Sequence, residues 1–139
     1  MKWVTREKVH VDRVACPWLI KRFVDKDAEF LFVPGDTDPK TIDYGTPYDM
    51  NGVELGHHGD ECSFDAIMKK YNLTGDPALV EVQKVVRGAD TGKYDASPLS
   101  EALSTFARGF GLTSKDDHEN HARQFPMYDA LYAYFKNKI

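Results

Sequence analysis

The first third of the chain contains short apolar runs separated by polar turns, and the remainder shows helical periodicity. Val9 and Val11 alternate with polar neighbours, which predicts a short half-buried strand. The apolar and aromatic run EFLFV at 29–33 predicts a buried second strand. Between them, Pro17 suits the first turn of a helix, and apolar residues at helical spacing predict that helix over roughly 17–25. This order predicts a β-α-β unit, which is right-handed if its strands are parallel.

The middle of the chain combines turn-forming residues with two helix-start signals. The segment 35–52 is rich in Gly, Pro, Asp and Thr, which predicts a loop with one short turn of helix. We expect a third strand over residues 53–57. Ser63 can cap a helix whose apolar residues recur at i, i+3, i+4 and i+7. Asp76-Pro77 combines a cap with a first-turn proline and predicts a helix that ends near Arg87-Gly88.

The last forty residues predict two more helices. Ser97-Pro98 precedes an apolar stripe that ends at Gly109 or Gly111. The final helix is predicted to start near Ser114, with a kink or break at Pro126. These patterns predict the α+β class, in which a small N-terminal sheet with a β-α-β start is covered by about five helices and the C-terminal half is helical. We expect a single domain over residues 1–139.

Composition narrows the class of protein. The 139 residues are 42% hydrophobic and 29% charged, which is typical of a globular protein and excludes the signature of disorder. No apolar run approaches the ~20 residues of a membrane span, and the N-terminus lacks the apolar core of a signal peptide. A net charge of −4 argues against a general nucleic-acid binder, because phosphate contacts need a basic face. We therefore expect a cytoplasmic protein that binds no membrane.

The densest polar cluster is the segment 54–62, which reads ELGHHGDEC. His57 and His58 are flanked by glycines between a predicted strand and a helix. In an extended segment neighbouring side chains point to opposite faces, so both histidines can reach one ion only if the backbone bends past the strand end. The alternative is one structural histidine and one solvated histidine.

A second cluster, DDHENH at 116–121, lies at the start of the last predicted helix. His118 and His121 are three residues apart and share a helix face that continues with aromatic residues. A histidine on a core face needs a carboxylate, a carbonyl or a metal as its partner. The acids, Asp117 among them, also suit the positive end of the helix dipole.

Two further segments carry charge near helix ends. In RGADT at 87–91, Asp90 can cap the next turn or serve as a hard oxygen ligand. Arg87 at a helix C-terminus is a stabilising placement, and its planar guanidinium also suits an anion clamp. Near Cys16, Arg13 and Arg22 could attract an oxyanion.

The two cysteines, Cys16 and Cys62, are too few for a disulfide scaffold. They fit free thiols, and two small core residues are the plain interpretation. The nucleotide-binding, hydrolase and zincin motifs are absent from the sequence.

Six segments in chain order carry a family resemblance: VDRVACPWLIKRFVD, EFLFVP, VELGHHGDECSFDAI, VVRGADT, DDH and YDALYAYF. Together they resemble the C-terminal domain of the chromate-resistance protein ChrB, over residues 5–135. The resemblance implies a domain linked to bacterial chromate resistance. In ChrB-type regulators the domain follows an N-terminal region thought to contact DNA. We expect a stand-alone version of the domain, with no nucleic-acid binding by the isolated chain.

The leading hypothesis is a cytosolic metal-binding domain with a mixed His/Asp site. The resemblance joins the separate clusters, because all of them fall within its segments. We expect the ligands His58, Asp90 and His118, with His57 or Asp117 completing the set. Imidazole plus carboxylate suits a divalent transition metal such as zinc, iron, manganese or nickel.

Two alternatives stay open. One is a redox or oxyanion-handling enzyme that acts on chromate, with Cys16 and Cys62 as its thiols and the three arginines Arg13, Arg22 and Arg87 as its anion contacts. The other is a non-catalytic sensor or interaction module whose clusters are core hydrogen-bond networks. Whether the domain is an enzyme depends on which of the three hypotheses holds.

Overall fold

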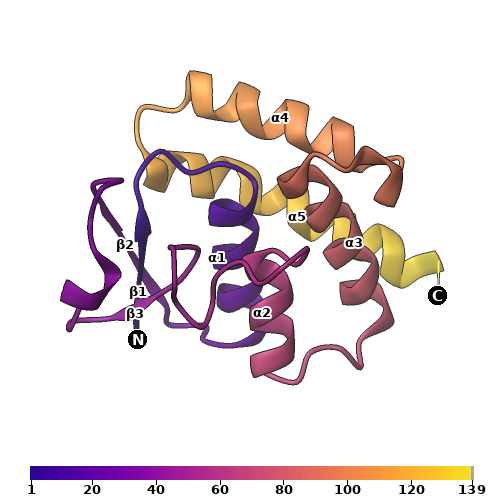
Figure 1. Ribbon diagram of the computed structural model, residues 1–139. Coiled ribbons are helices and arrows are strands. Elements are labelled where there is room, and N and C mark those ends of the chain that lie inside the picture. The colour runs from indigo at the N-terminus through magenta and orange to yellow at the C-terminus, as the bar shows by residue number, and fades with distance from the viewer. Residues whose placement is uncertain (139) are drawn as a thin grey trace.

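The computed structural model describes residues 1–138 and combines a small parallel sheet with five α-helices (Figure 1). The central strand β1 (Lys2–Arg6) pairs in parallel with β2 (Glu29–Val33) and with β3 (Thr46–Pro47), so the strand order is β2-β1-β3. Helix α1 (Asp12–Phe23) connects β1 to β2. The predicted α+β class, the strand at 29–33 and the β-α-β start with parallel strands are confirmed.

The first strand lies earlier than predicted. Residues 3–5 are all fully buried, because β1 is the central strand and is covered on both faces. A strand buried on both faces lacks the apolar and polar alternation on which the prediction relied. Val9 and Val11 are buried in the loop between β1 and α1 rather than in a strand. The Asp117 carboxylate fixes this loop by accepting the backbone N–H groups of residues 8 and 9, both at 2.9 Å.

The third strand is also displaced, from the predicted 53–57 to Thr46–Pro47. Residues 53–57 instead fold back on the turn before them, and Asp49 N donates to Leu55 O at 2.9 Å. A Cβ on Gly56 would lie 2.8 Å from the Met50 carbonyl oxygen, so this close approach needs a glycine. The one short helical turn predicted in this loop is the 3₁₀ helix η1 (Pro39–Thr41).

Helix α1 begins five residues before the predicted start, so Pro17 lies inside it. Proline has no N–H, and the Arg13 carbonyl therefore lacks its usual partner four residues later. His121 supplies one, because its Nε2 lies 3.1 Å from Arg13 O. A side chain from the last helix thus stabilises the interior of the first.

Four helices follow the sheet region: α2 (Ser63–Lys70), α3 (Pro77–Thr91), α4 (Ser100–Thr113) and α5 (Asp117–Lys138). Asp76 caps α3 as predicted, since its Oδ1 accepts from the backbone N–H groups of residues 78 and 79. Helix α3 continues past the predicted end to Thr91, before Gly92 in the left-handed conformation. A short 3₁₀ helix, η2 (Tyr94–Ala96), follows. The prediction at Pro126 was a kink or a break, and the break is absent, because α5 is one helix with Pro126 inside it.

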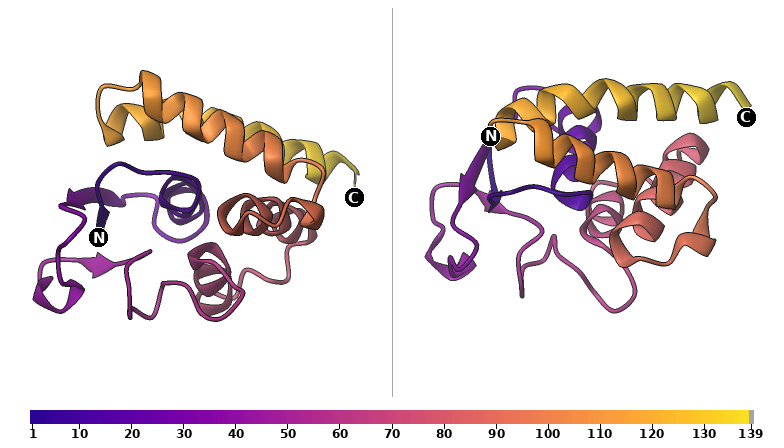
Figure 2. Two further views of the ribbon diagram at one scale, coloured as in Figure 1. Left: turned by 45° about the horizontal axis from the view of Figure 1, so that its top comes forward. Right: turned by 90° about the horizontal axis from the view of Figure 1, so that it is seen from above.

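Helices α4 and α5 form a layer over α1 and α3 (Figure 2). The α1–α5 contact contains the stacked rings of Trp18 and Tyr128, whose centroids are 5.7 Å apart. The α3–α4 contact depends on Gly88, where a Cβ would lie 2.9 Å from the Cβ of Ser100. Within residues 1–138, none of the helices has both the length and the apolar character that a membrane crossing needs. The ends of α1, α2 and α3 that this packing brings together surround the site described below.

Candidate functional site

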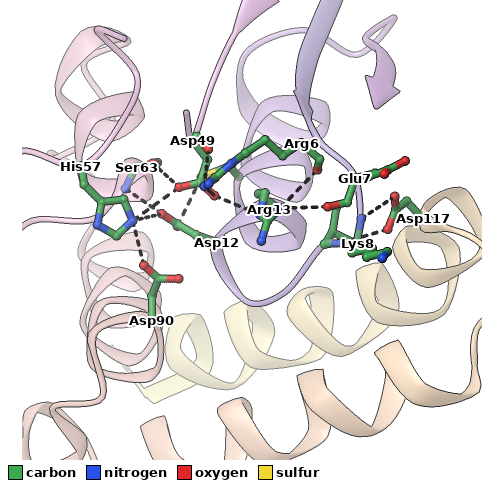
Figure 3. Close-up of polar contacts among 12 residues, drawn as sticks. Arg6, Glu7, Lys8, Asp12, Arg13, Asp49, His57, Ser63, Asp90 and Asp117 are labelled. Carbon is green, nitrogen blue, oxygen red and sulfur yellow. Dashed lines mark hydrogen bonds and ion pairs between the residues drawn. The ribbon is translucent and has the colours of Figure 1, made fainter. Parts of the chain in front are cut away.

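One imidazole and three carboxylates converge from four separate segments (Figure 3). Asp12 opens α1, Asp49 follows β3, His57 lies in the loop before α2, and Asp90 lies in the last turn of α3. His57 Nε2 is 2.9 Å from Asp90 Oδ2. It is also 3.4 Å from Asp49 Oδ1 and 3.5 Å from Asp12 Oδ2. We call these four residues the His57 cluster.

Asp12 is held at the start of α2 and is only 2% exposed. Its Oδ2 accepts the Ser63 N–H at 2.7 Å, and its Oδ1 accepts the Phe64 N–H at 3.3 Å. A helix N-terminus stabilises such an anion through its free N–H groups and its dipole. Burial nevertheless raises the pKa of Asp12, although the hydrogen bond from His57 acts to lower it. The Asp12 carboxylate is therefore held firmly in place, but nearby positive charge only partly offsets the cost of burying its negative charge.

Asp49 is buried and faces a cation on its outer side. Arg13 Nε lies 3.3 Å from Asp49 Oδ2, and Ser63 Oγ donates to Asp49 Oδ1 at 2.7 Å. The Asp49 backbone has a φ of +49°, a left-handed conformation that Asp tolerates better than most residues. This turn is what aims its carboxylate at His57.

Asp90 is in an unfavourable position for a lone anion. It lies at the C-terminal end of α3, where the helix dipole is negative, and its side chain is 16% exposed. Burial together with the charges of Asp12 and Asp49 raises the pKa of Asp90 to about 7. The same surroundings raise the pKa of His57 to about 10, chiefly through its hydrogen bonds to Asp12 and Asp49. The cluster therefore favours a positive charge at its centre.

Side chains that could hold a metal ion form two overlapping groups within residues 1–138. The first group is Asp12, Asp49 and His57, and the second is Asp12, Cys62 and Asp90. In each group the ligand atoms lie within 4.8 Å of one another. Asp12 belongs to both groups, which makes it the central residue of the site.

The structure brings together two of the five residues predicted as ligands, His57 and Asp90. His58 points elsewhere, because its Nε2 lies 2.8 Å from the carbonyl oxygen of Glu54. Of the two histidines, the structure therefore directs only His57 into the cluster.

The other two predicted ligands, His118 and Asp117, lie at the start of α5 outside both groups. The His118 ring packs edge-on against Phe32, with centroids 4.9 Å apart. The Asp117 carboxylate is occupied by the backbone N–H groups of residues 8 and 9. His121 is the buried histidine of this helix, and burial lowers its pKa to about 4. The prediction that both histidines face the core is therefore confirmed only for His121.

Each of the three arginines predicted to bind an anion is paired with its own carboxylate. Arg13 pairs with Asp49 at 3.3 Å, and Arg22 pairs with Asp129 at 3.0 Å. Arg87 Nε lies 3.0 Å from an oxygen of Asp65. Arg13 and Arg22 lie near opposite ends of α1, and Arg87 lies on α3. The structure does not gather them into one anion clamp.

The two thiols are free and buried, and each lies next to an acidic side chain. Cys16 Sγ donates to Asp12 Oδ1 at 3.4 Å, and Cys62 Sγ donates to Asp65 Oδ2 at 3.3 Å. Burial, helped by the nearby charge of Asp12, raises the pKa of both thiols. Because the thiolate is the reactive form, this environment is the opposite of the one that activates a catalytic cysteine.

Sequence reasoning did not predict a metal-ligand role for Asp12 or single out Asp49. Asp12 lies in the first segment of the family resemblance, which was the available signal. Asp49 begins the run DMNG, which is typical of a turn and gives no sign of a ligand. Its approach to His57 depends on the fold-back of residues 49–55, a contact that no periodicity encodes.

A cleft of about 970 Å³ lies between the loop before α1 and helices α3, α4 and α5. Asp90 lines its wall and links the cleft to the His57 cluster. The charged lining of the cleft is mixed, with the basic Lys8, Arg108 and Lys115 beside the acidic Glu7, Asp90, Asp116 and Asp117. On the other side of the cluster, His57 is 49% exposed. The cluster is thus in contact with solvent at His57 and borders the cleft at Asp90.

Comparisons with known proteins point to one family. The model of the ChrB C-terminal domain matches residues 3–135. Protein ChrB of Cupriavidus metallidurans strain CH34 is 30% identical to this chain over 138 residues. That match covers 98% of this chain and 41% of the relative, so the chain spans about two fifths of the length of the curated relative. No solved structure matches the chain.

Proposed function

The chain belongs to the ChrB C-terminal domain family, and we propose that it is a metal-binding domain with the His57 cluster as its centre. The ligands in this proposal are Asp12, Asp49, His57 and Asp90. The link to chromate resistance or response comes from the family resemblance. The metal site comes from the geometry of the cluster.

The observation that carries the proposal is the convergence of three largely buried carboxylates on one imidazole nitrogen. Like charges at this distance disfavour one another, and burial adds a desolvation cost to each. In the metal-free protein a protonated His57 offsets part of that charge. A divalent cation would offset more of it, with each carboxylate as a direct ligand.

The donor set favours a hard or borderline metal. Three carboxylate oxygens suit manganese and iron, and the imidazole suits iron, zinc and nickel. Manganese and iron are therefore our first candidates. Zinc and nickel are the second choice, because the cluster offers one nitrogen to three oxygens.

We further propose that the ion is accessible rather than sealed. The half-exposed His57 and the cleft beside Asp90 leave room for a small ligand to reach it. Chromate or another oxyanion is the candidate that the family resemblance suggests. The bound metal ion would supply the positive charge that attracts it, because the cleft carries acidic as well as basic side chains. This arrangement suits a sensing or catalytic site, since structural metal sites are closed by protein ligands.

Calorimetric titration of the tag-free protein with manganese, iron, zinc and nickel at about pH 7.5 tests the proposal. The pKa of His57 is about 10, so the ion must displace the His57 proton, and metal binding should release a proton. Asp49→Asn and His57→Gln should each weaken binding by at least about tenfold. His58→Ala and His118→Ala are matched controls, since both histidines lie outside the cluster.

The controls also decide between two ligand sets. Retained binding in His58→Ala and His118→Ala, with loss in His57→Gln, supports the His57 cluster. The reverse pattern would favour the set expected from the sequence, His58, Asp90 and His118. Absence of binding for all four metals would refute a metal-binding function.

A further inference from the structure

Cys62 places a thiol beside two carboxylates of the His57 cluster. Its Sγ and one oxygen each from Asp12 and Asp90 lie within 4.8 Å of one another. Donors around one divalent ion have a similar spacing, since metal–sulfur bonds are about 2.3 Å and metal–oxygen bonds about 2.1 Å. Small side-chain movements would therefore bring all three into contact with an ion.

The backbone holds Cys62 firmly at this position. Cys62 is the N-cap of α2, and its N–H donates to Asp65 Oδ2 at 2.8 Å. Asp65 is in turn fixed by Arg87 and by Gln83, whose Nε2 donates to Asp65 Oδ1 at 2.6 Å. The sulfur atom is fully buried and faces a carboxylate-rich space. A thiolate there would need a cation as its partner.

We propose that the centre contains two overlapping ligand sets and that Cys62 gives it a second, thiophilic mode of binding. A hard ion is held by the oxygen and imidazole donors of the His57 cluster. A thiophilic ion such as cadmium or zinc shifts toward Cys62 and is held by its thiolate together with Asp12 and Asp90. The Cys62 proton leaves to solvent as the metal–sulfur bond forms. This inference rests on the proposed metal-binding function and adds the class of ion that the centre accepts.

Chemical softness explains why one centre would use two ligand sets. Thiolate ligands favour soft ions, whereas carboxylates favour hard ones. Asp12 is shared by both groups, so a small shift of the ion toward Cys62 brings the thiolate into the ligand set. Cys16 contacts Asp12 Oδ1 as well but belongs to neither group, which makes it the natural comparison within residues 1–138.

Cadmium is the probe, because cadmium bound to a thiolate absorbs in the ultraviolet through sulfur-to-metal charge transfer. The wild-type protein should show this absorption as cadmium is added, and Cys62→Ser should lose it. Cadmium affinity should fall at least about tenfold in Cys62→Ser, while manganese affinity should stay within about twofold. Serine is a favoured N-cap, so the start of α2 should survive the substitution.

Cys16→Ser is the matched control and should keep the cadmium absorption. Cadmium binding without thiolate absorption in the wild-type protein would overturn the inference, as would loss of the absorption in Cys16→Ser. In either case, manganese binding that depends on His57 would leave the proposed function intact. If neither manganese nor cadmium binds, the proposed function fails as well.

Discussion

The surroundings of Asp90 and His57 favour the protonated form of both side chains. Both pKa values are raised, that of Asp90 from 3.8 to about 7 and that of His57 from 6.5 to about 10. A raised pKa means that the folded state binds the proton more tightly than the unfolded state. For both groups the linked stability is present at low pH and is lost as pH rises toward the folded-state value.

The contribution of these two groups to the stability of the metal-free protein should therefore fall as pH rises from about 4 to about 10, while buried His121, whose pKa is lowered, contributes in the opposite direction below about pH 6.5. Asp90→Asn removes the Asp90 part of this dependence. We expect the variant to gain stability relative to the wild type between about pH 4 and pH 8, because it no longer places an unfavourable carboxylate at the end of α3. Thermal unfolding in a chelating buffer measures this.

The exposed Asp36 provides the control for this measurement. Asp36→Asn should follow the wild-type pH profile. If Asp90→Asn instead loses relative stability as the pH is raised, the raised pKa of Asp90 is incorrect. The same variant should lose metal affinity, which separates a stabilising change from a functional one.

At the scale of elements, a hydrogen bond joins α1 and α5 and replaces a helical bond that Pro17 removes. Pro17 leaves the Arg13 carbonyl without its helical donor, and His121 Nε2 lies 3.1 Å from that oxygen. His121 also stacks on Phe125, with ring centroids 5.4 Å apart. The imidazole is therefore both a donor to α1 and part of the aromatic packing under α5.

A double-mutant cycle tests this link. His121→Phe keeps an aromatic ring but leaves the Arg13 carbonyl unsatisfied, at a cost of about 1–3 kcal/mol in unfolding free energy. Pro17→Ala restores a backbone N–H that can donate to the same carbonyl. The cost of His121→Phe should therefore be smaller by about 1 kcal/mol in the Pro17→Ala background. Urea denaturation gives these energies, and strictly additive effects would contradict the link.

Local signals in the sequence predicted the elements that are stabilised locally. Asp76-Pro77 marks the start of α3 because an N-cap bonds to the helix that it opens. Pro17 misled the same kind of reasoning. A proline signals a first turn, and only the distant His121 explains how it is accommodated inside α1.

The candidate site was harder to predict because its members meet only through tertiary packing. The alternation of side-chain directions applies to an extended strand, and residues 53–57 form none, so it could not say which of His57 and His58 faces the site. Asp90 stood out in the sequence because it follows an amphipathic stripe at a helix end. Asp49 reaches the site through a turn with a left-handed residue, which no helical or strand period reveals.

At the scale of the whole molecule, the net negative charge limits the partners that the chain can bind. The chain has 18 basic and 22 acidic residues, and several basic side chains are paired with carboxylates. Specific DNA binding requires many phosphate contacts, each from a basic group. We expect no specific DNA binding by this chain, with or without metal. Gel-shift titration against its own upstream region at about 100 mM salt checks this, and sequence-specific binding below micromolar concentration would contradict it.

The ligands of the His57 cluster are far apart along the chain, from residue 12 to residue 90, and α4 and α5 contribute none of them. A bound ion would therefore act as a reversible cross-link that closes a long loop of the polypeptide, much as a disulfide does. Unlike a disulfide, its strength is set by mass action. At free metal about 100-fold above the dissociation constant, the folded state would gain about 2.7 kcal/mol. The melting temperature of this domain would then report the metal concentration around it.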